Sequence, residues 1–338
     1  MGDVTIKQVA KAAGVGIATV SRVLLQNPSV APELRRRVEE AVRKLGYEPN
    51  ASAQSMRTRT TRTIACAIRD SSIPEFGPFV RAAEAVIRRA GYTLLLTNTD
   101  DDPTQEFELV KVLGRRRIDG LMLTRSQQAD RRLDEALQKL KIPIVYIDRD
   151  PSPIADTVVI DHQHGIRAAV DHLVSLGHER IALVTGRPAM RPARERIEAF
   201  RAAMESHGLP VNPQLVCAQS FSSEEAFQYA SLLLSTEPPP TAVIAGGMAL
   251  LPAVLRAVKL RHMKVREDIA IIAGCDCDLA ELTSPAITAI RWDITAWGRI
   301  CAQLLLDRIS DPGNREAGRN IILPTELVIR QSCRHPRC

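Results

Sequence analysis

The 338-residue sequence has no apolar run of about 18 residues, the length that a helix needs to cross a bilayer. Its opening, MGDVTIKQVAKAAG, lacks the charged-then-apolar layout of a secretory signal peptide. Hydrophobic residues make up 45% and charged residues 25%, which is typical of a globular chain of two or three domains. We therefore expect a cytoplasmic protein that does not contact membranes.

The patterns of common catalytic and cofactor sites are also missing. No GxGxxG or GxxxxGK phosphate loop occurs, and the segment GRP at 186–188 matches neither pattern. No nucleophile and base have the spacing of a catalytic pair. The sequence thus predicts neither an enzyme nor a bound cofactor.

Disulfides and metals are not expected either. The seven cysteines are an odd number, and most stand singly in apolar runs, as Cys66 does, which indicates buried thiols in a reducing compartment. Cys275 and Cys277 alternate on one expected strand, and His162 and His164 follow another, but neither pair has a convincing further ligand nearby. We expect no metal site, and a tail over residues 331–338.

The positive charge is confined to the start of the chain. The net charge is +6, and residues 1–62 carry 11 Lys/Arg and 5 Asp/Glu, so the remainder is neutral. The first 62 residues are either a solvated helical surface or a segment that binds a polyanion such as nucleic acid.

Three short helices are expected within residues 1–48. Thr5 and Gln8 form a capping box for the first helix, and Gly14 ends it. A second helix should run from about residue 16 to 25 and a third from Pro32 to Gly46. In the second, Val20, Val23 and Leu24 should be buried, while the opposite face carries Ile17, Ala18, Ser21 and Arg22.

Two helices joined by a glycine turn and followed by a third are typical of a helix-turn-helix DNA-binding domain. Its second helix would enter the major groove. There Thr19 and Ser21 can bond phosphates, and Arg22 can bond guanine bidentately. The alternative from these residues is a structural three-helix bundle.

Residues 49–62 are expected to form a hinge helix and linker. Asn50 suits the N-cap of the short helix ASAQSMRT, which is too short to be stable without a partner. Its large apolar residue, Met56, lies among small ones and could wedge between base pairs in the minor groove. The alternative is a plain interdomain linker, which would not need Met56.

Residues 63–330 alternate apolar strands with helices, which predicts parallel sheets covered on both faces. The strands are too many for one sheet, so we expect two doubly wound lobes with a boundary near 150–161, in the proline-containing segment DRDPSPIADT. A ligand would bind in the cleft between them, at the carboxyl ends of the strands. The polar residues expected there are Asp70, Asp148, Asp161, Asp276 and Arg196. Each aspartate could instead be a helix cap or turn residue.

Blocks along almost the whole chain resemble the lactose-repressor family of bacterial transcription regulators. They include VTIKQVAKAAGVGIATVSRVL, LGYEPNASAQSM, TRTIACAIRD, LGHERIALVTG and PTELVIRQS. The resemblance implies a homodimer that binds a near-palindromic operator, with two periplasmic-binding-protein-like lobes around a small effector.

The resemblance also implies roles for individual residues. Base readout falls to Ile17, Ala18 and Arg22, and DNA backbone contacts to Thr5, Thr19, Ser21 and Tyr47. Hinge contacts fall to Asn50 and Ala53, with Met56 at the position where the family inserts a leucine. Effector contacts fall on Arg196, Phe221 and Asp276, and further on Glu75, Phe76, Asp148 and Asp161.

Several positions depart from the family pattern. Ala31 replaces a serine N-cap, Gly246 and Gly247 replace an asparagine and an aspartate that commonly bind sugar hydroxyls, and Glu75 replaces an aromatic residue. We expect a small polar metabolite of the sugar or sugar-acid class, with Arg196 holding its carboxylate. The leading hypothesis is an effector-controlled DNA-binding regulator, and we expect it to act as a repressor. The alternative is a solute-binding receptor without DNA-regulatory activity.

Overall fold

The computed structural model describes residues 4–24, 27–47, 60–74, 76–153, 155–219, 222–311, 313 and 318–336. The chain separates into two compact units, Met1–Thr61 and Arg62–Cys338. Among the described helices, none is both long enough and apolar enough to cross a membrane.

The first unit contains three helices, α1 (Ile6–Ala13), α2 (Ile17–Leu24) and α3 (Pro32–Leu45). Val9, Val20 and Val38, one from each helix, are fully buried and join the helices into one core. The Thr5 backbone N–H donates to Gln8 Oε1 at 2.7 Å, which completes the predicted capping box. The predicted helix-turn-helix unit is therefore confirmed.

Two details of α2 differ from the prediction. Ser21 was expected on the outer face but is buried in the unit, and Leu24 was expected in the core but is only half-buried. Ser21, next to the fully buried Val20, is 8% exposed and so belongs to the buried side of α2. The hinge residues Asn50, Ala53 and Met56 lie outside the described residues.

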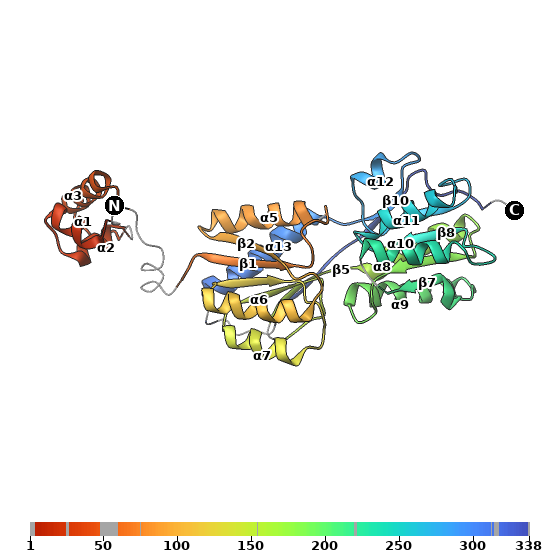
Figure 1. Cartoon of the computed structure of the whole chain (residues 1–338), viewed down its shortest axis with the longest axis horizontal. Coiled ribbons are helices and arrows are strands. Elements are labelled where there is room, and N and C mark those ends of the chain that lie inside the picture. The colour runs from red at the N-terminus through yellow and green to blue at the C-terminus, as the bar shows by residue number, and fades with distance from the viewer. Residues whose placement is uncertain are drawn as a thin grey trace. The chain divides into compact units, whose positions relative to one another are not determined.

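The second unit contains two six-stranded sheets (Figure 1). The first sheet has the order β11-β5-β4-β3-β1-β2, and all its strands are parallel. Its strands are β1 (Thr63–Ile68), β2 (Thr93–Asn98), β3 (Gly120–Leu123), β4 (Ile144–Ile147), β5 (Asp156–Ile160) and β11 (Asn320–Leu323).

Helices cover both faces of the first sheet because side chains alternate along its strands. Along β1, Ile64 and Cys66 pack with α5 (Phe76–Arg89) and α13 (Ile294–Ser310). Ala65 and Ala67 pack with α6 (Pro103–Arg116) and α7 (Arg131–Leu140). Figure 1 shows α5 and α13 together on one side of β1, with α6 and α7 on the other.

The second sheet has the order β12-β10-β9-β8-β6-β7, and only the β12–β10 pair is antiparallel. Its strands are β6 (Ile181–Thr185), β7 (Val216–Ala218), β8 (Ala242–Ala245), β9 (Ala270–Ala273), β10 (Thr288–Arg291) and β12 (Glu326–Val328). One face packs on α8 (His162–Ser175) and α9 (Arg191–Ser206), and the other on α10 (Ser223–Leu233) and α11 (Leu250–Leu260). A short 3-10 helix, η1 (Pro213–Leu215), and α12 (Asp278–Leu282) complete this lobe. The predicted pair of parallel-sheet lobes is confirmed.

The chain crosses between the lobes three times. The first crossing follows β5, at Ile160, and the second follows β10, because α13 packs on α5 of the first lobe. The third lies between β11, which pairs with β5, and β12, which pairs with β10. The sequence analysis placed one boundary, near 150–161, and gave no sign of the two later crossings.

Candidate functional site

The start of α2 presents a small group of exposed side chains on the first unit. Ile17 is 39% exposed, Ala18 and Arg22 are exposed, and Thr19 is half-buried. Gly16, just before the helix, accepts the backbone N–H of Thr19 at 2.9 Å. Of the expected backbone-contacting residues, Thr5 is exposed and Tyr47 is half-buried against the core.

Arg22 differs from the arginines of α3. Arg36 pairs with Glu33 at 2.9 Å, Arg37 donates to the Ala13 carbonyl at 2.7 Å, and Arg35 donates to the Asn27 carbonyl at 2.7 Å. The Arg22 side chain has no hydrogen-bond or ion-pair partner among the described residues. Its guanidinium is therefore available to an outside partner.

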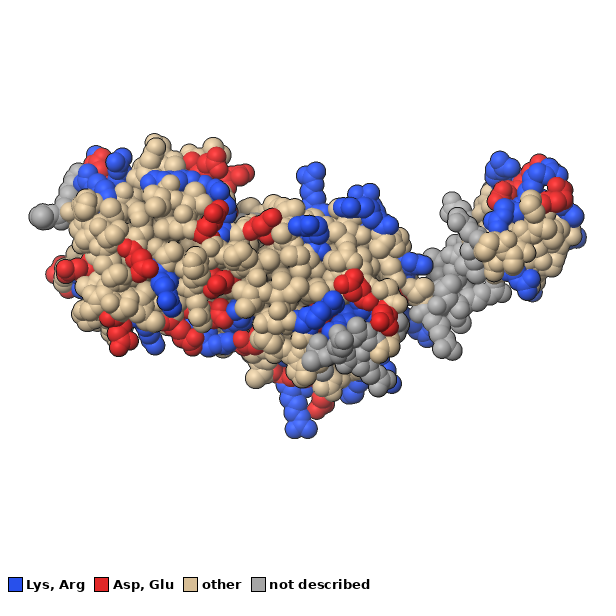
Figure 2. Space-filling model, turned by 180° about the vertical axis from the view of Figure 1, so that it is seen from behind, with Lys and Arg blue, Asp and Glu red and all other residues tan. Residues whose placement is uncertain are grey.

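The second unit has no comparable excess of charge. Over its visible face, Lys and Arg side chains alternate with Asp and Glu (Figure 2), in line with the equal numbers of acidic and basic residues over residues 63–338. The basic excess of the chain thus belongs to the segment that contains α2.

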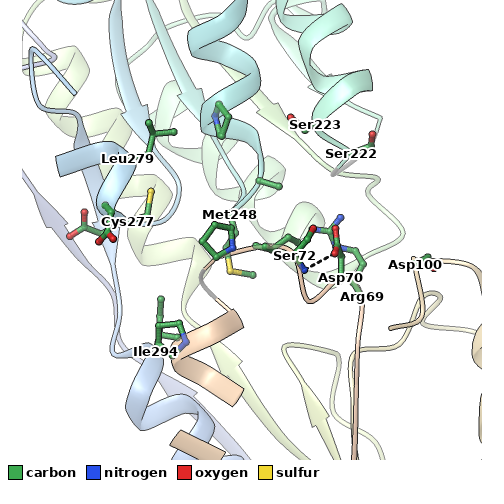
Figure 3. Close-up of a pocket in the computed structure, with 17 residues that line it drawn as sticks. Arg69, Asp70, Ser72, Asp100, Ser222, Ser223, Met248, Cys277, Leu279 and Ile294 are labelled. Atoms are coloured by element: carbon green, nitrogen blue, oxygen red, sulfur yellow. Dashed lines mark hydrogen bonds between the residues drawn. The ribbon is translucent and has the colours of Figure 1, made fainter. Parts of the chain in front are cut away.

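A cavity of about 800 Å³ opens between the lobes, at the carboxyl ends of their strands (Figure 3). Its volume lies within the range of small-molecule sites. Residues from both lobes line it: Arg69, Asp70, Ser72, Ile73, Pro74, Pro78, Asp100 and Ile294 from the first, and Ser222, Ser223, Met248, Ala249, Pro252, Asp276, Cys277, Asp278 and Leu279 from the second.

The expected effector residues are only partly brought together. Asp276 lines the cavity, whereas Phe76, Asp148, Asp161 and Arg196 are not part of its lining. Glu75 and Phe221 lie outside the described residues. Asp70, which the strand-end pattern also singled out, does line the cavity and accepts the Ser72 N–H at 2.8 Å.

Asp276 is held between two arginines. Arg330 donates to it at 2.7 and 3.0 Å, and Arg291 donates at 2.8 Å. Burial raises the pKa of Asp276, but the hydrogen bonds from Arg330 and Arg291 outweigh that effect and hold the pKa below its ordinary value. The carboxylate therefore stays ionised and fixed in place.

Two of the expected effector residues make structural contacts. Phe76 is 4% exposed and packs edge-on against Phe79 at 6.2 Å between ring centroids. Asp161 caps α8 by accepting the His164 N–H at 2.9 Å, which is the cap alternative left open for it.

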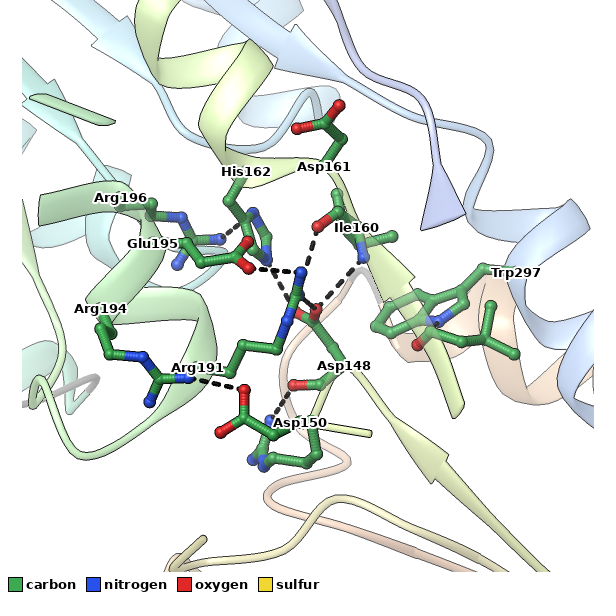
Figure 4. Close-up of polar contacts among 12 residues, drawn as sticks. Asp148, Asp150, Ile160, Asp161, His162, Arg191, Arg194, Glu195, Arg196 and Trp297 are labelled. Carbon is green, nitrogen blue, oxygen red and sulfur yellow. Dashed lines mark hydrogen bonds and ion pairs between the residues drawn. The ribbon is translucent and has the colours of Figure 1, made fainter. Parts of the chain in front are cut away.

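A buried polar cluster joins the lobes beside the cavity (Figure 4). Asp148, at the end of β4, lies 2.8 Å from His162 Nε2 and 3.0 Å from Arg191 Nη1 of the other lobe. Arg196 Nη2 lies 3.2 Å from His162 Nδ1, and Arg194 pairs with Asp150 at 2.6 Å. Asp148 and Arg196, expected to hold an effector, are thus bound to other protein groups.

Burial governs the protonation of this cluster. Burial, together with the nearby Arg196, lowers the pKa of His162 to about 4, while Asp148 opposes the shift. Burial also lowers the pKa of Arg196 to about 10. Asp148 has a lowered pKa because its contacts with His162 and Arg191 outweigh its burial. At neutral pH the cluster therefore holds a neutral imidazole among charged partners.

Arg196, expected as a carboxylate anchor in the cleft, is not part of the lining of this cavity. It is 4% exposed, and Trp292 packs edge-on against its partner His162 at 6.3 Å between ring centroids. Gly246 and Gly247 are buried and add no polar side chain to the cleft. A Cβ at Gly246 would lie 3.4 Å from Arg196 Cδ, so Gly246 lies next to the aliphatic stem of the arginine.

The sequence analysis missed several cavity residues. Arg69 and Asp100 follow β1 and β2 directly, so the strand-end pattern that found Asp70 could have found them. Ile294 had no such signal, because it reaches the cavity only through the second lobe crossing.

Two lobes around a cavity, together with a helix-turn-helix unit, define a ligand-binding DNA-binding protein. Comparisons agree with that class. Residues 5–50 match the family described as "Bacterial regulatory proteins, lacI family", and residues 170–333 match the periplasmic binding protein-like domain.

The relatives are named transcriptional regulators. The chain is 33% identical to the HTH-type transcriptional repressor PurR of Haemophilus influenzae (strain PittEE), over 97% of this chain and 98% of the relative. It is 34% identical to the HTH-type transcriptional regulator DegA of Bacillus subtilis (strain 168), over 97% of each. A lac repressor dimer bound to operator and the anti-inducer ONPF matches with a TM-score of 0.83 at 26% identity, over 98% of this chain and 99% of that one.

The chain belongs to the lacI family of bacterial regulatory proteins. It is a DNA-binding transcriptional regulator with an effector-binding domain, as the sequence analysis predicted, and its relatives are regulators and not enzymes.

Proposed function

We propose that the chain acts as a homodimeric repressor that binds a near-palindromic operator through two copies of its helix-turn-helix unit. The solved lac repressor relative is a dimer bound to operator, which supports this assembly. Two symmetry-related units read two half-sites about one helical turn apart, so the operator repeats the two-fold symmetry of the protein.

The observation that carries the proposal is Arg22. It is exposed on α2, beside Ile17 and Ala18, and has no partner among the described residues. A guanidinium in the major groove bonds guanine O6 and N7 bidentately and discriminates by about 1–3 kcal/mol. Thr5, Thr19 and Tyr47 then contact the DNA backbone, as does Ser21 from its buried position through a small local shift. Asn50, Ala53 and Met56 contact the minor groove.

Operator affinity depends on a small molecule in the cavity between the lobes. The solved complex of the regulator CelR with cellobiose, which is 29% identical to this chain with a TM-score of 0.73, supports an effector site in this domain. A ligand that contacts both lobes favours the arrangement in which both sets of contacts form, and so changes the population that can bind DNA.

The test begins with selection of a preferred duplex from random sequences by the full-length protein at physiological salt. Arg22→Lys keeps the charge but removes the bidentate fork. We expect it to reduce the preference for the selected duplex over random DNA by about 10- to 100-fold, while random-DNA binding stays unchanged.

Arg36→Lys is the matched control, because Arg36 is already paired with Glu33 on α3, and we expect it to keep the preference. Selection of no duplex would contradict the proposed function. An Arg22→Lys variant that keeps the full preference would contradict the role of Arg22.

A further inference from the structure

Basic side chains gather at one edge of the first lobe. Its sheet is parallel, and α5, α6 and α7 lead into β2, β3 and β4, so these helices all end at the edge where the strands begin. We call this surface the linker edge, because the chain from the first unit enters β1 there. The exposed basic side chains at the helix ends are Arg88, Arg89, Arg115, Arg116, Lys139 and Lys141.

Backbone contacts bring the starts of these strands together. The Thr93 N–H, which begins β2, donates to the Arg62 carbonyl at 2.8 Å. The Asp119 N–H, just before β3, donates to the Thr63 carbonyl at 2.8 Å, and β3 pairs with β4. The helix ends that precede these strands by a few residues therefore form one surface.

The acidic side chains at the linker edge are mostly engaged with the first lobe. Those in the described part of the chain are Glu84, Asp119, Asp156, Asp307 and Asp311. The first four bond to an arginine or to a backbone N–H of this lobe, and Asp311 has no such side-chain partner among the described residues. The edge thus keeps an excess of positive charge, although acidic and basic residues balance over residues 63–338.

Four of the cations are uncommitted. Arg88 pairs with Glu84, and Arg89 donates to a carbonyl of its own helix. The side chains of Arg115, Arg116, Lys139 and Lys141 have no hydrogen-bond or ion-pair partner within the described residues. These four can therefore reach an outside anion.

The helix dipole is the simplest alternative reason for cations at these ends, because a positive charge stabilises the carboxyl end of any helix. In their last turns α5, α6 and α7 carry five Lys/Arg. The four helices α8 to α11 of the second lobe carry one Lys and one His in theirs. A general need to balance helix dipoles would not separate the two lobes in this way.

The linker limits how far DNA can be from this edge. The first unit belongs to a DNA-binding family, and residues 48–62 join it to β1. A segment of this length spans at most about 50 Å. Such a tether gives the phosphates of bound DNA a high effective concentration at the linker edge, so even weak contacts contribute to affinity.

We propose that the linker edge is a second DNA-contacting surface, whose cations bind phosphates of the duplex held by the helix-turn-helix unit. The inference rests on the proposed function in taking duplex DNA as the partner. It goes beyond that function, which places every DNA contact in residues 1–62. Phosphate contacts carry no sequence information, so this surface adds affinity and not specificity.

The variant Arg115→Gln/Arg116→Gln/Lys139→Gln removes three of the uncommitted cations. Its affinity for a random-sequence duplex is measured on the full-length protein by fluorescence anisotropy over a series of salt concentrations. Each phosphate contact adds about 0.9 to the slope of log affinity against log salt. We expect the slope to become shallower by about 2 to 3, and binding at about 0.1 M salt to weaken about tenfold.

Two controls separate this surface from net charge and from side-chain shape. Arg167→Gln/Arg201→Gln/Lys259→Gln removes three exposed cations from α8, α9 and α11 of the second lobe, and it should change the slope by less than about 0.5. Arg115→Lys/Arg116→Lys keeps the charge of the linker edge and should keep the wild-type slope.

Three results would overturn the inference: an unchanged slope in the linker-edge Gln variant, an equal loss in the second-lobe control, or an equal loss in the Lys variant. A lower free energy of unfolding with an unchanged slope would assign these cations to helix stability alone.

The proposed function is tested separately, by the preference for a selected duplex over random DNA. The linker-edge Gln variant should keep that preference, because it weakens binding to both duplexes alike. If no duplex were preferred, the proposed function would fail, while the salt slopes would still decide whether the linker edge contacts DNA.

Discussion

At the scale of single residues, the neighbours of a side chain decide what it can do. His162 and Arg196 have the composition of a binding site, yet each is 4% exposed and bonded within the protein. Arg22 lies in a short helix among small residues and is free of partners among the described residues. The same guanidinium chemistry is therefore used within the protein at Arg196 and is available to an outside partner at Arg22.

His162 should make stability depend on pH. Its pKa is about 4 in the folded protein and about 6.5 in an unfolded chain, so below about pH 6.5 the unfolded chain binds a proton that the folded one does not. The free energy of unfolding should fall as pH decreases through this window. Between about pH 7 and about pH 5 the contribution is about 2 kcal/mol. Urea unfolding of wild type and His162→Gln measures it as the difference between their pH slopes.

His207 provides the control for this measurement. It is exposed and lies 2.7 Å from Asp171, so His207→Gln removes an imidazole without disturbing the buried cluster and should not reproduce the change of slope produced by His162→Gln. His172 and His178 also have pKa values lowered by burial, and they remain in all three proteins. Equal slopes for wild type and His162→Gln would contradict the assignment.

At the scale of elements, close helix packing and helix caps set local stability. α13 belongs to the first lobe because it packs against α5, where Gly298 lies directly on the backbone of Phe79. A Cβ at position 298 would overlap the Phe79 carbonyl. Gly298 is needed because α13 and α5 approach each other closely at this position, and not because of an unusual backbone conformation.

Gly298→Ala should therefore destabilise the second unit by about 3 kcal/mol or more, because two helix backbones must move apart. Gly77→Ala in α5 is the matched control, since a Cβ there meets nothing within 4 Å. Alanine favours a helix over glycine by up to about 1 kcal/mol, so Gly77→Ala should be neutral or stabilising. Urea unfolding of both variants measures the contrast, and similar destabilisation by both would refute it.

Ala31 leaves the start of α3 without a side-chain cap. Its backbone is extended, with φ −54° and ψ 138°, which suits a serine cap. Ala31→Ser should stabilise the helix by about 1 kcal/mol and slow amide exchange in α3 about fivefold. Exchange in α8 of the same protein is the internal control, and unchanged exchange in α3 would count against the cap.

At the scale of the whole second unit, ion pairs between the lobes accompany the three chain crossings. Arg191 reaches Asp148 at 3.0 Å, and both side chains are almost fully buried. Arg194 reaches Asp150 at 2.6 Å in a more exposed position, where 36% of the arginine side chain is accessible. The two pairs join the same lobes but differ in burial.

Removing the buried Arg191 should lower the free energy of unfolding more than removing the exposed Arg194. Arg191→Met leaves the buried Asp148 without one of its cations and should lower the free energy of unfolding by about 3 kcal/mol. Arg194→Met should lower it by less than about 1 kcal/mol, because water replaces the exposed pair. Urea unfolding at neutral pH compares the two, and an equal effect would show that burial does not govern these contacts.

Much of the fold could be predicted from local patterns. The start of α3 at Pro32 and the left-handed Gly14 and Gly46 that end α1 and α3 follow from capping preferences. The strands β1, β4, β6, β8 and β9 are apolar runs whose ends appear in the sequence. β7, β10, β11 and β12 were missed, because each has only three or four residues, too few for a periodic pattern to be recognised.

The candidate site was less predictable. Asp276 and Asp70 were found because they end strands, and such ends meet at one edge of a parallel sheet. Phe76 and Arg196 were also expected at the effector site; neither lines this cavity, Phe76 packs on Phe79, and Arg196 bonds to His162. Which way a side chain turns depends on partners that are distant in sequence.

The amino-acid sequence alone determined the helix-turn-helix unit, the parallel lobes and the family, because these follow from apolar periodicity, caps and motifs that act over a few residues. Only the tertiary structure decided the three lobe crossings, the buried Asp148–His162–Arg191 cluster and the lining of the cavity. Those features join Asp148 to Arg191 and bring residues of both lobes to one cavity across long stretches of chain, and such arrangements exist only once both lobes have packed.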